Sequence, residues 1–239
     1  MRLAVVSDIH GNRTAFDAVL ADLRQTSPDL ILHGGDLGDS GSSPAEVVDR
    51  IRDLGWPGVV GNTDEMLFDP ESLTRFASGL PHLKSLFDTI AEMAAAARET
   101  LGEERLAWLR CLPRVQIHEH FALVHATPGT AWRAPMDSAG DGDLESAYGP
   151  LGRAVVVYGH IHCPYIRNVC GIVVANSGSV GLPHDGDRRA SYLLLDDGQP
   201  SIRRVEYDVD RELKALRGSG MPHADWFARI LESASPQMP

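Results

Sequence analysis

The sequence is poor in cysteine and contains no long apolar run. Its three cysteines are odd in number and irregularly spaced: Cys111, Cys163 and Cys170. This predicts reduced thiols rather than a disulfide framework, and the absence of paired cysteines excludes an all-thiolate structural metal site. No apolar stretch approaches the roughly 20 residues that cross a bilayer. The apolar run at residues 3–6 is too short for a signal peptide, so we expect a cytoplasmic protein with no membrane partner.

Basic residues are also scarce. The 239 residues include 22 Lys and Arg against 33 Asp and Glu, which gives a formal net charge of −11 at pH 7. Binding of DNA or RNA needs clustered Lys and Arg that displace counterions, and no basic run in the sequence supplies them. We therefore expect no nucleic-acid polymer as a partner, whereas small phosphates held by metal ions are compatible with this charge.

Short apolar runs alternate with helical patterns in the first half of the sequence. Residues 13–24 place apolar side chains at helical spacing. A second helix is expected over residues 43–54, where Ser43 can cap the start, Pro44 suits the first turn and Glu46 completes a capping box. Strands are expected at residues 3–6, 30–32 and 59–60. This alternation of strand and helix predicts a parallel sheet.

The remainder divides into a helical segment and a strand-rich segment. Residues 65–112 are expected to form a helical insertion over one edge of the sheet, with helices at residues 84–100 and 103–111. Residues 127–142 have the composition of a long loop, a kind of segment that often carries function. Further strands, of which the first two form a hairpin, are expected at residues 115–117, 121–124, 155–158, 172–175, 192–195 and 202–207. We expect one α/β domain over residues 1–239.

Metal-type side chains follow five of the expected strands: Asp8, His10, Asp36, Asn62, His125, His160 and His162. In open α/β sheets, ligands bind beyond the carboxyl ends of the strands, so these residues are expected to converge. Asp and Asn offer hard oxygen donors and His offers nitrogen donors, a mixed set that suits Mn²⁺, Fe, Zn²⁺, Ni²⁺ or Mg²⁺. Seven donors exceed what one tetrahedral ion takes, and they fit two ions roughly 3.5–4 Å apart that share a carboxylate. We expect two divalent metal ions, with Mn²⁺ favoured.

Five motifs occur in a fixed order around these residues. They read D-I-H-G-N, G-G-D, G-N-T-D, V-H-A and G-H-I-H. On these motifs the sequence resembles the calcineurin-like metallophosphoesterase superfamily over residues 2–195. Within it, the sequence is similar to the small bacterial and archaeal phosphodiesterases related to diadenosine tetraphosphatase, whose N-P-G-S-V signature resembles N-S-G-S-V-G at residues 176–181. The resemblance implies a four-layer αββα sandwich, in which two β-sheets pack together and helices flank them.

The resemblance also implies a role for each donor. One ion would be held by Asp8, His10, Asp36 and His162, and the other by Asp36, Asn62, His125 and His160. Asp36 would then bridge the two ions, and a hydroxide between the ions would attack the phosphorus in line. Asp36 and Asn62 are accordingly catalytic candidates.

One position departs from the family pattern. Many members read G-N-H-[DE], where the histidine contacts the scissile phosphate, whereas this sequence has Thr63. A threonine hydroxyl is no general acid near neutral pH. The departure favours leaving groups that need little protonation, and hence a phosphodiester over a phosphoprotein. Asp64, a third catalytic candidate, is interpreted as orienting a ligand histidine.

Three residues are candidates for contact with the substrate: Thr63, Arg133 and His184. Arg133 and Trp132 lie in the long loop after His125, where they can contact a phosphate and a base or simply pack at the rim.

Three further polar residues have structural interpretations. Asn12 precedes a helix and is expected to be its N-cap. His33 lies in a strand pattern and is expected to be a core residue with satisfied hydrogen bonds. Asp39 is expected to be a solvated loop acid.

The leading hypothesis is hydrolysis of a small phosphodiester by a dinuclear metal centre. Cleavage of dinucleoside polyphosphates is an alternative within the same chemistry. A non-catalytic interaction module that retains the fold is an alternative of another class. It is disfavoured because such proteins lose ligand residues, whereas all seven positions remain here. A small phosphate ester is the one partner that the sequence predicts.

Overall fold

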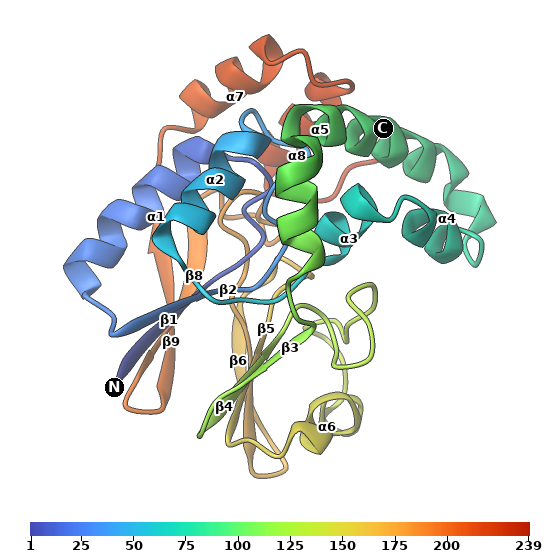
Figure 1. Cartoon of the computed structure of the whole chain (residues 1–239). Coiled ribbons are helices and arrows are strands. Elements are labelled where there is room, and N and C mark those ends of the chain that lie inside the picture. The colour runs from blue at the N-terminus through green and yellow to red at the C-terminus, as the bar shows by residue number, and fades with distance from the viewer.

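The computed structural model describes residues 1–239 and contains two mixed β-sheets that pack face to face (Figure 1). The first sheet consists, in spatial order, of β2 (Leu30–His33), β1 (Arg2–Val6), β8 (Ala190–Asp196) and β9 (Gln199–Val205). The second consists of β3 (Val115–Ile117), β4 (Phe121–Val124), β5 (Val155–Tyr158), β7 (Ile172–Asn176) and β6 (Tyr165–Val169). The pairs β1–β2, β4–β5 and β5–β7 are parallel, so the carboxyl ends of these strands share an edge within each sheet.

Alternate residues of β1 point to opposite faces of the first sheet. Leu3 and Val5 pack against Leu123 and Val157 of the second sheet, in the core between the two sheets. Ala4 and Val6 instead face the helices on the outer side. Because strand side chains alternate with a period of two, an unbroken apolar run is what a strand buried on both faces requires.

Helices cover both outer faces of the sandwich. α1 (Arg13–Thr26) and α2 (Pro44–Leu54) pack over the first sheet, and α6 (Asp141–Tyr148) packs over the second. The other helices gather at one end of the sandwich (Figure 1): α3 (Asn62–Phe68), α4 (Glu71–Ala77), α5 (Lys84–Arg110), α7 (Val209–Gly218) and α8 (Ala224–Ser233). Short 3₁₀ turns occupy Pro81–Leu83 and Gly149–Leu151. The predicted αββα sandwich is confirmed.

The expected strand at residues 59–60 is wrong. Gly58 makes one isolated parallel bridge with His33, and the Val59 N–H donates to the His33 carbonyl at 3.1 Å. The segment that runs beside β2 is too short to form a ladder. It nevertheless brings Asn62 to the carboxyl end of β2.

The expected capping box of α2 is also wrong, because Ser43 makes no side-chain cap bond and Glu46 pairs with Arg13 of α1 instead. The helices expected on either side of residue 102 form one element, α5, which bends at Gly102 with φ 69° and ψ 167°. β6 has no counterpart among the expected strands, since Arg167 and Asn168 interrupt its apolar pattern.

Two local expectations are confirmed. Asn12 caps α1, because its side chain accepts a hydrogen bond from the Ala15 N–H at 2.9 Å. β3 and β4 form the expected hairpin. Of the helices, none has both the length and the apolar composition that crossing a membrane requires.

Candidate metal centre

All predicted donors except Asn62, the first residue of α3, lie just after strands, and five of them have an unusual backbone conformation. Asp8, His10, Asp36, His160 and His162 all adopt the left-handed region, with φ of 56°, 50°, 55°, 67° and 57°. This region costs an L-residue roughly 1–2 kcal/mol. Such strain persists only where surrounding contacts hold it, and it clusters at functional sites. The loops that follow β1, β2 and β5 therefore show the backbone signature of a built site.

Four buried side chains form the first donor group: Asp8, His10, Asp36 and His162. One ligand atom from each lies within 4.8 Å of all the others. The His162 Nε2 is 3.1 Å from Asp8 Oδ1 and 3.1 Å from the His10 Nε2. The His10 Nε2 is 3.8 Å from Asp36 Oδ2. Two imidazole nitrogens thus face each other across two carboxylates, as they would around a shared cation.

A second donor group lies on the other side of Asp36 and consists of Asp36, Asn62, His125 and His160. The Asn62 Oδ1 is 2.8 Å from the His160 Nδ1 and 3.0 Å from the His125 Nε2. The His125 Nε2 is 3.4 Å from Asp36 Oδ2. Asp36 therefore faces both groups, and their oxygen and nitrogen donors fit two divalent ions.

Three donor histidines each make a hydrogen bond through the ring nitrogen that faces away from the site, and this bond fixes the orientation of the ring. The Nδ1 of His125 donates to the Gly34 carbonyl at 2.8 Å, and that of His162 donates to the Leu182 carbonyl at 2.5 Å. The Nδ1 of His10 donates to Asp39 Oδ1 at 2.7 Å. Such contacts fix the tautomer and leave Nε2 free to bind a metal.

The expected solvated position of Asp39 is wrong. Asp39 is only 3% exposed, and its carboxylate is held against His10. In the sequence, the only indication that Asp39 could lie near the donors is its position three residues after Asp36, in the same short loop. That spacing does not reveal which way the side chain turns.

Asp64 has a different partner from the expected histidine. Its carboxylate accepts hydrogen bonds from the backbone N–H groups of Asp36 at 2.8 Å, Leu37 at 2.9 Å and Gly61 at 3.0 Å. It makes no hydrogen bond to a histidine, because in the first turn of α3 it folds back onto the helix start. Asp64 thus ties the loop of Asp36 to the start of the helix that carries Asn62. Burial, and next the charge of Asp36, raise its pKa to about 7.

The two donor carboxylates remain ionised despite their burial. Burial opposes the charged form of Asp8, but His162 holds its pKa below the ordinary value. Burial likewise opposes the charged form of Asp36, while the surrounding histidines, His125 first among them, together hold its pKa below the ordinary value. A buried pair of carboxylates attracts cations, which suits a metal centre.

The histidines respond to the same charges. Burial lowers the pKa of His10, but the surrounding carboxylates, Asp39 first among them, together outweigh burial and raise the pKa to about 9. Burial is likewise outweighed at His125, where Asp36 raises the pKa to about 10. At His160, burial and next the charge of His125 lower the pKa to about 4.

Two glycines leave room for the donor carboxylates. A Cβ at Gly61 would lie 2.0 Å from Asp36 Oδ1, and one at Gly159 would lie 2.3 Å from Asp8 Oδ2. Any other residue at either position would displace a donor atom.

Two of the three substrate candidates lie beside the donors. The Thr63 N–H donates to Asp36 Oδ1 at 2.9 Å, while the Thr63 Oγ1 is buried without a hydrogen-bond partner. The His184 ring packs on His162 with 4.3 Å between centroids, and its Nε2 is also buried without a partner. Burial, and next the charge of His162, lower the pKa of His184 to about 2.

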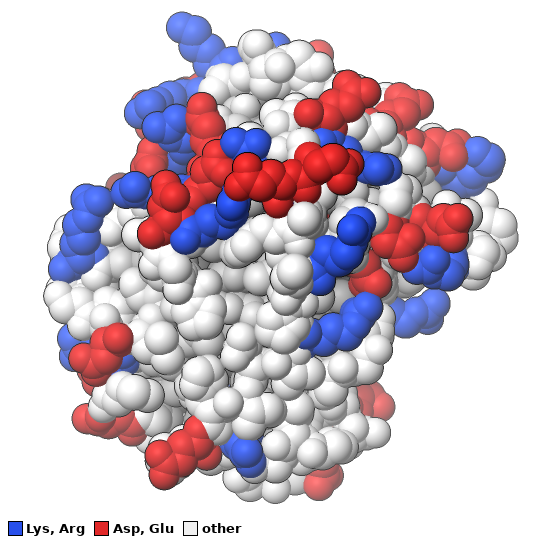
Figure 2. Space-filling view, viewed as in Figure 1, with Lys and Arg blue, Asp and Glu red and all other residues white.

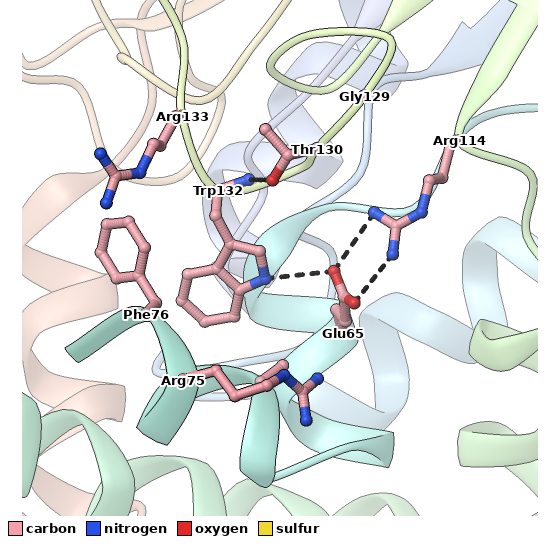
Figure 3. A pocket seen from close by; sticks show the side chains of 9 residues that line it. Glu65, Arg75, Phe76, Arg114, Gly129, Thr130, Trp132 and Arg133 are labelled. Carbon is pink, nitrogen blue, oxygen red and sulfur yellow. Dashed lines mark hydrogen bonds and ion pairs between the residues drawn. The ribbon is translucent and has the colours of Figure 1, made fainter. Parts of the chain in front are cut away.

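Arg133, the third candidate, points over the Phe76 ring, with its guanidinium carbon 5.4 Å from the centroid (Figure 3). Beside it, the Trp132 Nε1 donates to Glu65 at 3.1 Å, and Arg114 pairs with the same carboxylate at 2.8 Å. These contacts anchor the loop after His125 to α3. Arg133 itself has no acidic partner and lies next to a hollow whose wall includes His160 and His184.

Comparisons with known proteins agree with this geometry. A model of the calcineurin-like phosphoesterase superfamily domain matches residues 1–198. The protein MJ0912 of Methanocaldococcus jannaschii is 30% identical over 253 aligned positions, which cover 96% of each chain. The symmetrical bis(5'-nucleosyl)-tetraphosphatase of Methylococcus capsulatus is 31% identical over 149 positions, covering 61% of this chain and 50% of that protein.

Solved structures extend the likeness to the whole chain. The metallophosphoesterase of Sphaerobacter thermophilus superposes with a TM-score of 0.79 at 25% identity, over 98% of this chain and 99% of that one. The fold of the hypothetical protein PH1004 of Pyrococcus horikoshii OT3 matches with a TM-score of 0.85 at 18% identity, over 99% of each chain. Together with the family model, these matches show that the chain belongs to the calcineurin-like phosphoesterase superfamily.

Proposed function

We propose that this protein is a dinuclear metal-dependent phosphodiesterase that acts on small phosphate esters. One observation carries the proposal: the buried carboxylate of Asp36 lies within 3.8 Å of the His10 Nε2 and 3.4 Å of the His125 Nε2, so it faces both donor groups. Membership of the phosphoesterase superfamily supports a hydrolase. A shared carboxylate between two sets of donors is the arrangement that two-ion hydrolysis requires.

The first donor group would hold one ion and the second donor group the other. When bound, the two ions would lower the pKa of water and neutralise charge on the phosphoryl oxygens. Carboxylate, amide and imidazole donors suit Mn²⁺, which we propose as the metal.

The chain's own residues position the reaction. Asp39 and the carbonyls of Gly34 and Leu182 hold three imidazole rings in place. Thr63 Oγ1 and His184 Nε2 have no partner within the protein and are free to hydrogen-bond phosphoryl oxygens. Because such bonds are made before the reaction starts, they stabilise developing charge without reorganisation.

Two features support a small diester over a phosphoprotein or a nucleic acid. Thr63 supplies no general acid, which favours leaving groups that depart without strong protonation. Figure 2 shows the molecule from the same side as Figure 1. A band of Asp and Glu crosses the upper part of the face drawn, with Lys and Arg interspersed and no continuous basic patch. Phosphate backbones would find little attraction there.

A metal-exchange experiment tests the proposal. Protein loaded with Mn²⁺ is expected to bind about two ions per chain and to hydrolyse bis-p-nitrophenyl phosphate. Exhaustive chelation should abolish turnover, and added Mn²⁺ should restore it. Full turnover by the chelated protein, or no metal bound at micromolar free Mn²⁺, would contradict the proposal.

A second candidate function is cleavage of dinucleoside polyphosphates. It is favoured by the 31% identity to the tetraphosphatase of Methylococcus capsulatus, an alignment that spans half of that protein. Rates on diadenosine tetraphosphate and on simple diesters, measured with the same Mn²⁺-loaded protein, separate the two. A kcat/KM that is higher for the tetraphosphate would favour this candidate.

A further inference from the structure

A cavity of about 380 Å³ opens directly beside the metal centre. At one end its wall includes donors of both groups, namely His10, Asn62 and His160. From there the cavity extends between α3, α4, α5 and α8. A molecule bound at the metals therefore has room for its remaining atoms in this cavity, and a second hollow, lined by Arg133, opens beside the same His160 and His184.

The end of the cavity nearest the metals carries unused polar atoms. Thr63 and His184 line it, and the Oγ1 of the first and the Nε2 of the second are buried without a hydrogen-bond partner. Buried polar groups are normally paired, so each such atom needs an explanation. Oxygens of a bound phosphate ester would supply the missing partners.

The far end of the cavity is apolar. α5 contributes Leu86, Phe87 and Ile90, and α8 contributes Phe227 and Ile230. No Lys or Arg lines the cavity. The one carboxylate in its wall belongs to Asp39, which already accepts a hydrogen bond from His10. A second phosphate at this end would be buried without a cation, whereas an alkyl or aryl group would be buried favourably.

The nearby arginines lie outside this cavity. Arg75, Arg114 and Arg133 line a separate pocket, and Trp132 and Phe76 belong to the walls of both (Figure 3). Arg133 also lines the hollow beside His160 and His184, so it lies near the metal end of the cavity and not at its apolar end. The rings of Trp132 and Phe76 pack with 5.1 Å between centroids, so they form a partition between the cationic pocket and the apolar one.

We infer that the substrate is a phosphodiester with one uncharged, apolar ester group, which occupies the cavity between α5 and α8 while the phosphate lies at the metals. This inference rests on the proposed phosphodiesterase function. It narrows the substrate class to amphipathic esters, with an anionic phosphate at one end and an apolar group at the other.

A homologous substrate series tests the inference. The substrates are p-nitrophenyl alkyl phosphates with methyl, butyl, hexyl and octyl groups, which share one leaving group. With Mn²⁺-loaded protein, kcat/KM is expected to rise about three- to fourfold for each added methylene, until the cavity is filled. A rate that is independent of chain length, with the methyl ester still hydrolysed, would overturn the inference and leave the proposed function intact. No hydrolysis of any member would overturn the proposed function itself.

A variant that fills the cavity sharpens the test. Leu86→Trp should abolish the ratio of kcat/KM that favours the hexyl ester over the methyl ester. Ser85→Trp is the matched control, because Ser85 is exposed on the same helix and is absent from the cavity wall. The control should retain the full dependence on chain length, and equal losses in both variants would contradict the assignment.

Binding without turnover gives an independent readout. Hexylphosphonate and methylphosphonate resist hydrolysis and can be titrated calorimetrically into the Mn²⁺-loaded protein. Burial of the hexyl group should make the heat-capacity change of binding more negative than that for methylphosphonate. This difference should disappear in Leu86→Trp and persist in Ser85→Trp. Equal heat-capacity changes for the two phosphonates would overturn the inference.

Discussion

The metal centre and the apolar cavity share a boundary at His10, Asn62 and His160, but different parts of the chain build them. All donors except Asn62, which begins α3, lie on loops that leave the two sheets, and hydrogen bonds between these loops fix their backbone. The apolar end of the cavity is formed by side chains of α5 and α8. Under the proposed function, the reaction would depend on the positions of single donor atoms, whereas substrate selectivity would depend on the volume and polarity of the cavity wall.

The largest effect is expected at the carboxylate that faces both donor groups. Asp36→Asn keeps the shape of the side chain but removes its charge. We expect kcat for bis-p-nitrophenyl phosphate to fall on the order of 10³-fold, with a lower metal content by elemental analysis. The exposed acid Asp53 provides the control, and Asp53→Asn should leave both measurements unchanged. Retention of both ions and the full rate by Asp36→Asn would break the assignment of the metal centre.

A smaller effect is expected at Asp39, which contacts the donor His10 and is not itself a predicted metal ligand. Asp39→Asn weakens the hydrogen bond that aims His10 and should lower Mn²⁺ affinity roughly 10- to 100-fold. Because Asp39 only positions a donor, saturating Mn²⁺ should restore most of the rate. Calorimetric titration with Mn²⁺ measures the affinity, and Asp137→Asn in an exposed loop is the control. An unchanged affinity would show that Asp39 has no positioning role.

A third change leaves both regions intact and tests the scaffold beneath them. His33 is fully buried, neither ring nitrogen has a partner, and burial lowers its pKa to about 3 from 6.5. The folded protein keeps His33 neutral while the unfolded chain takes up a proton below pH 6.5, so the free energy of unfolding falls as pH falls. His33→Leu should remove about 2 kcal/mol of this loss at pH 5.

Urea unfolding of the metal-free protein at pH 5 and pH 8 measures that effect. The exposed His120 provides the control, since His120→Leu should not alter the pH dependence of stability. If His33→Leu left that dependence unchanged, His33 would not be the group responsible.

The smallest effect is expected where the two regions meet. Thr63→Val keeps the volume of the side chain and removes the unpartnered hydroxyl. If Thr63 Oγ1 bonds a phosphoryl oxygen, kcat/KM should fall about three- to tenfold, while Thr63→Ser should retain most of it. A Thr63→Val protein with unchanged kinetics would place Thr63 in the cavity wall only.

The sequence predicts the donors well because their pattern is local. All but Asn62 lie within a few residues of a strand end, and the parallel pairing of strands brings such ends to one edge. Asn62 follows a segment that runs beside β2 without forming a strand. Asp8 and His10 follow the apolar run of β1, and His160 and His162 follow that of β5. The structure brings all seven predicted donors together, and their role as ligands remains a prediction.

The features that were missed depend on contacts between distant parts of the chain. The role of Asp39 depends on how one loop turns against His10. The cavity needs Leu86 and Ile230, which are far apart in sequence, to face each other. His33 is buried as expected, but its missing hydrogen bonds follow from packing around β2. No periodicity or motif encodes such pairings.

The left-handed backbone at five donors has a consequence for the protein before any substrate arrives. Without ions, the chain carries the conformational cost of those five residues, together with the mutual repulsion of Asp8 and Asp36. Ions that bind only the folded state would offset both and supply part of the free energy of folding. The concentration of free metal would then govern the fraction of the protein that is folded as well as its activity. At low metal concentration the protein would unfold in addition to losing its bound ions.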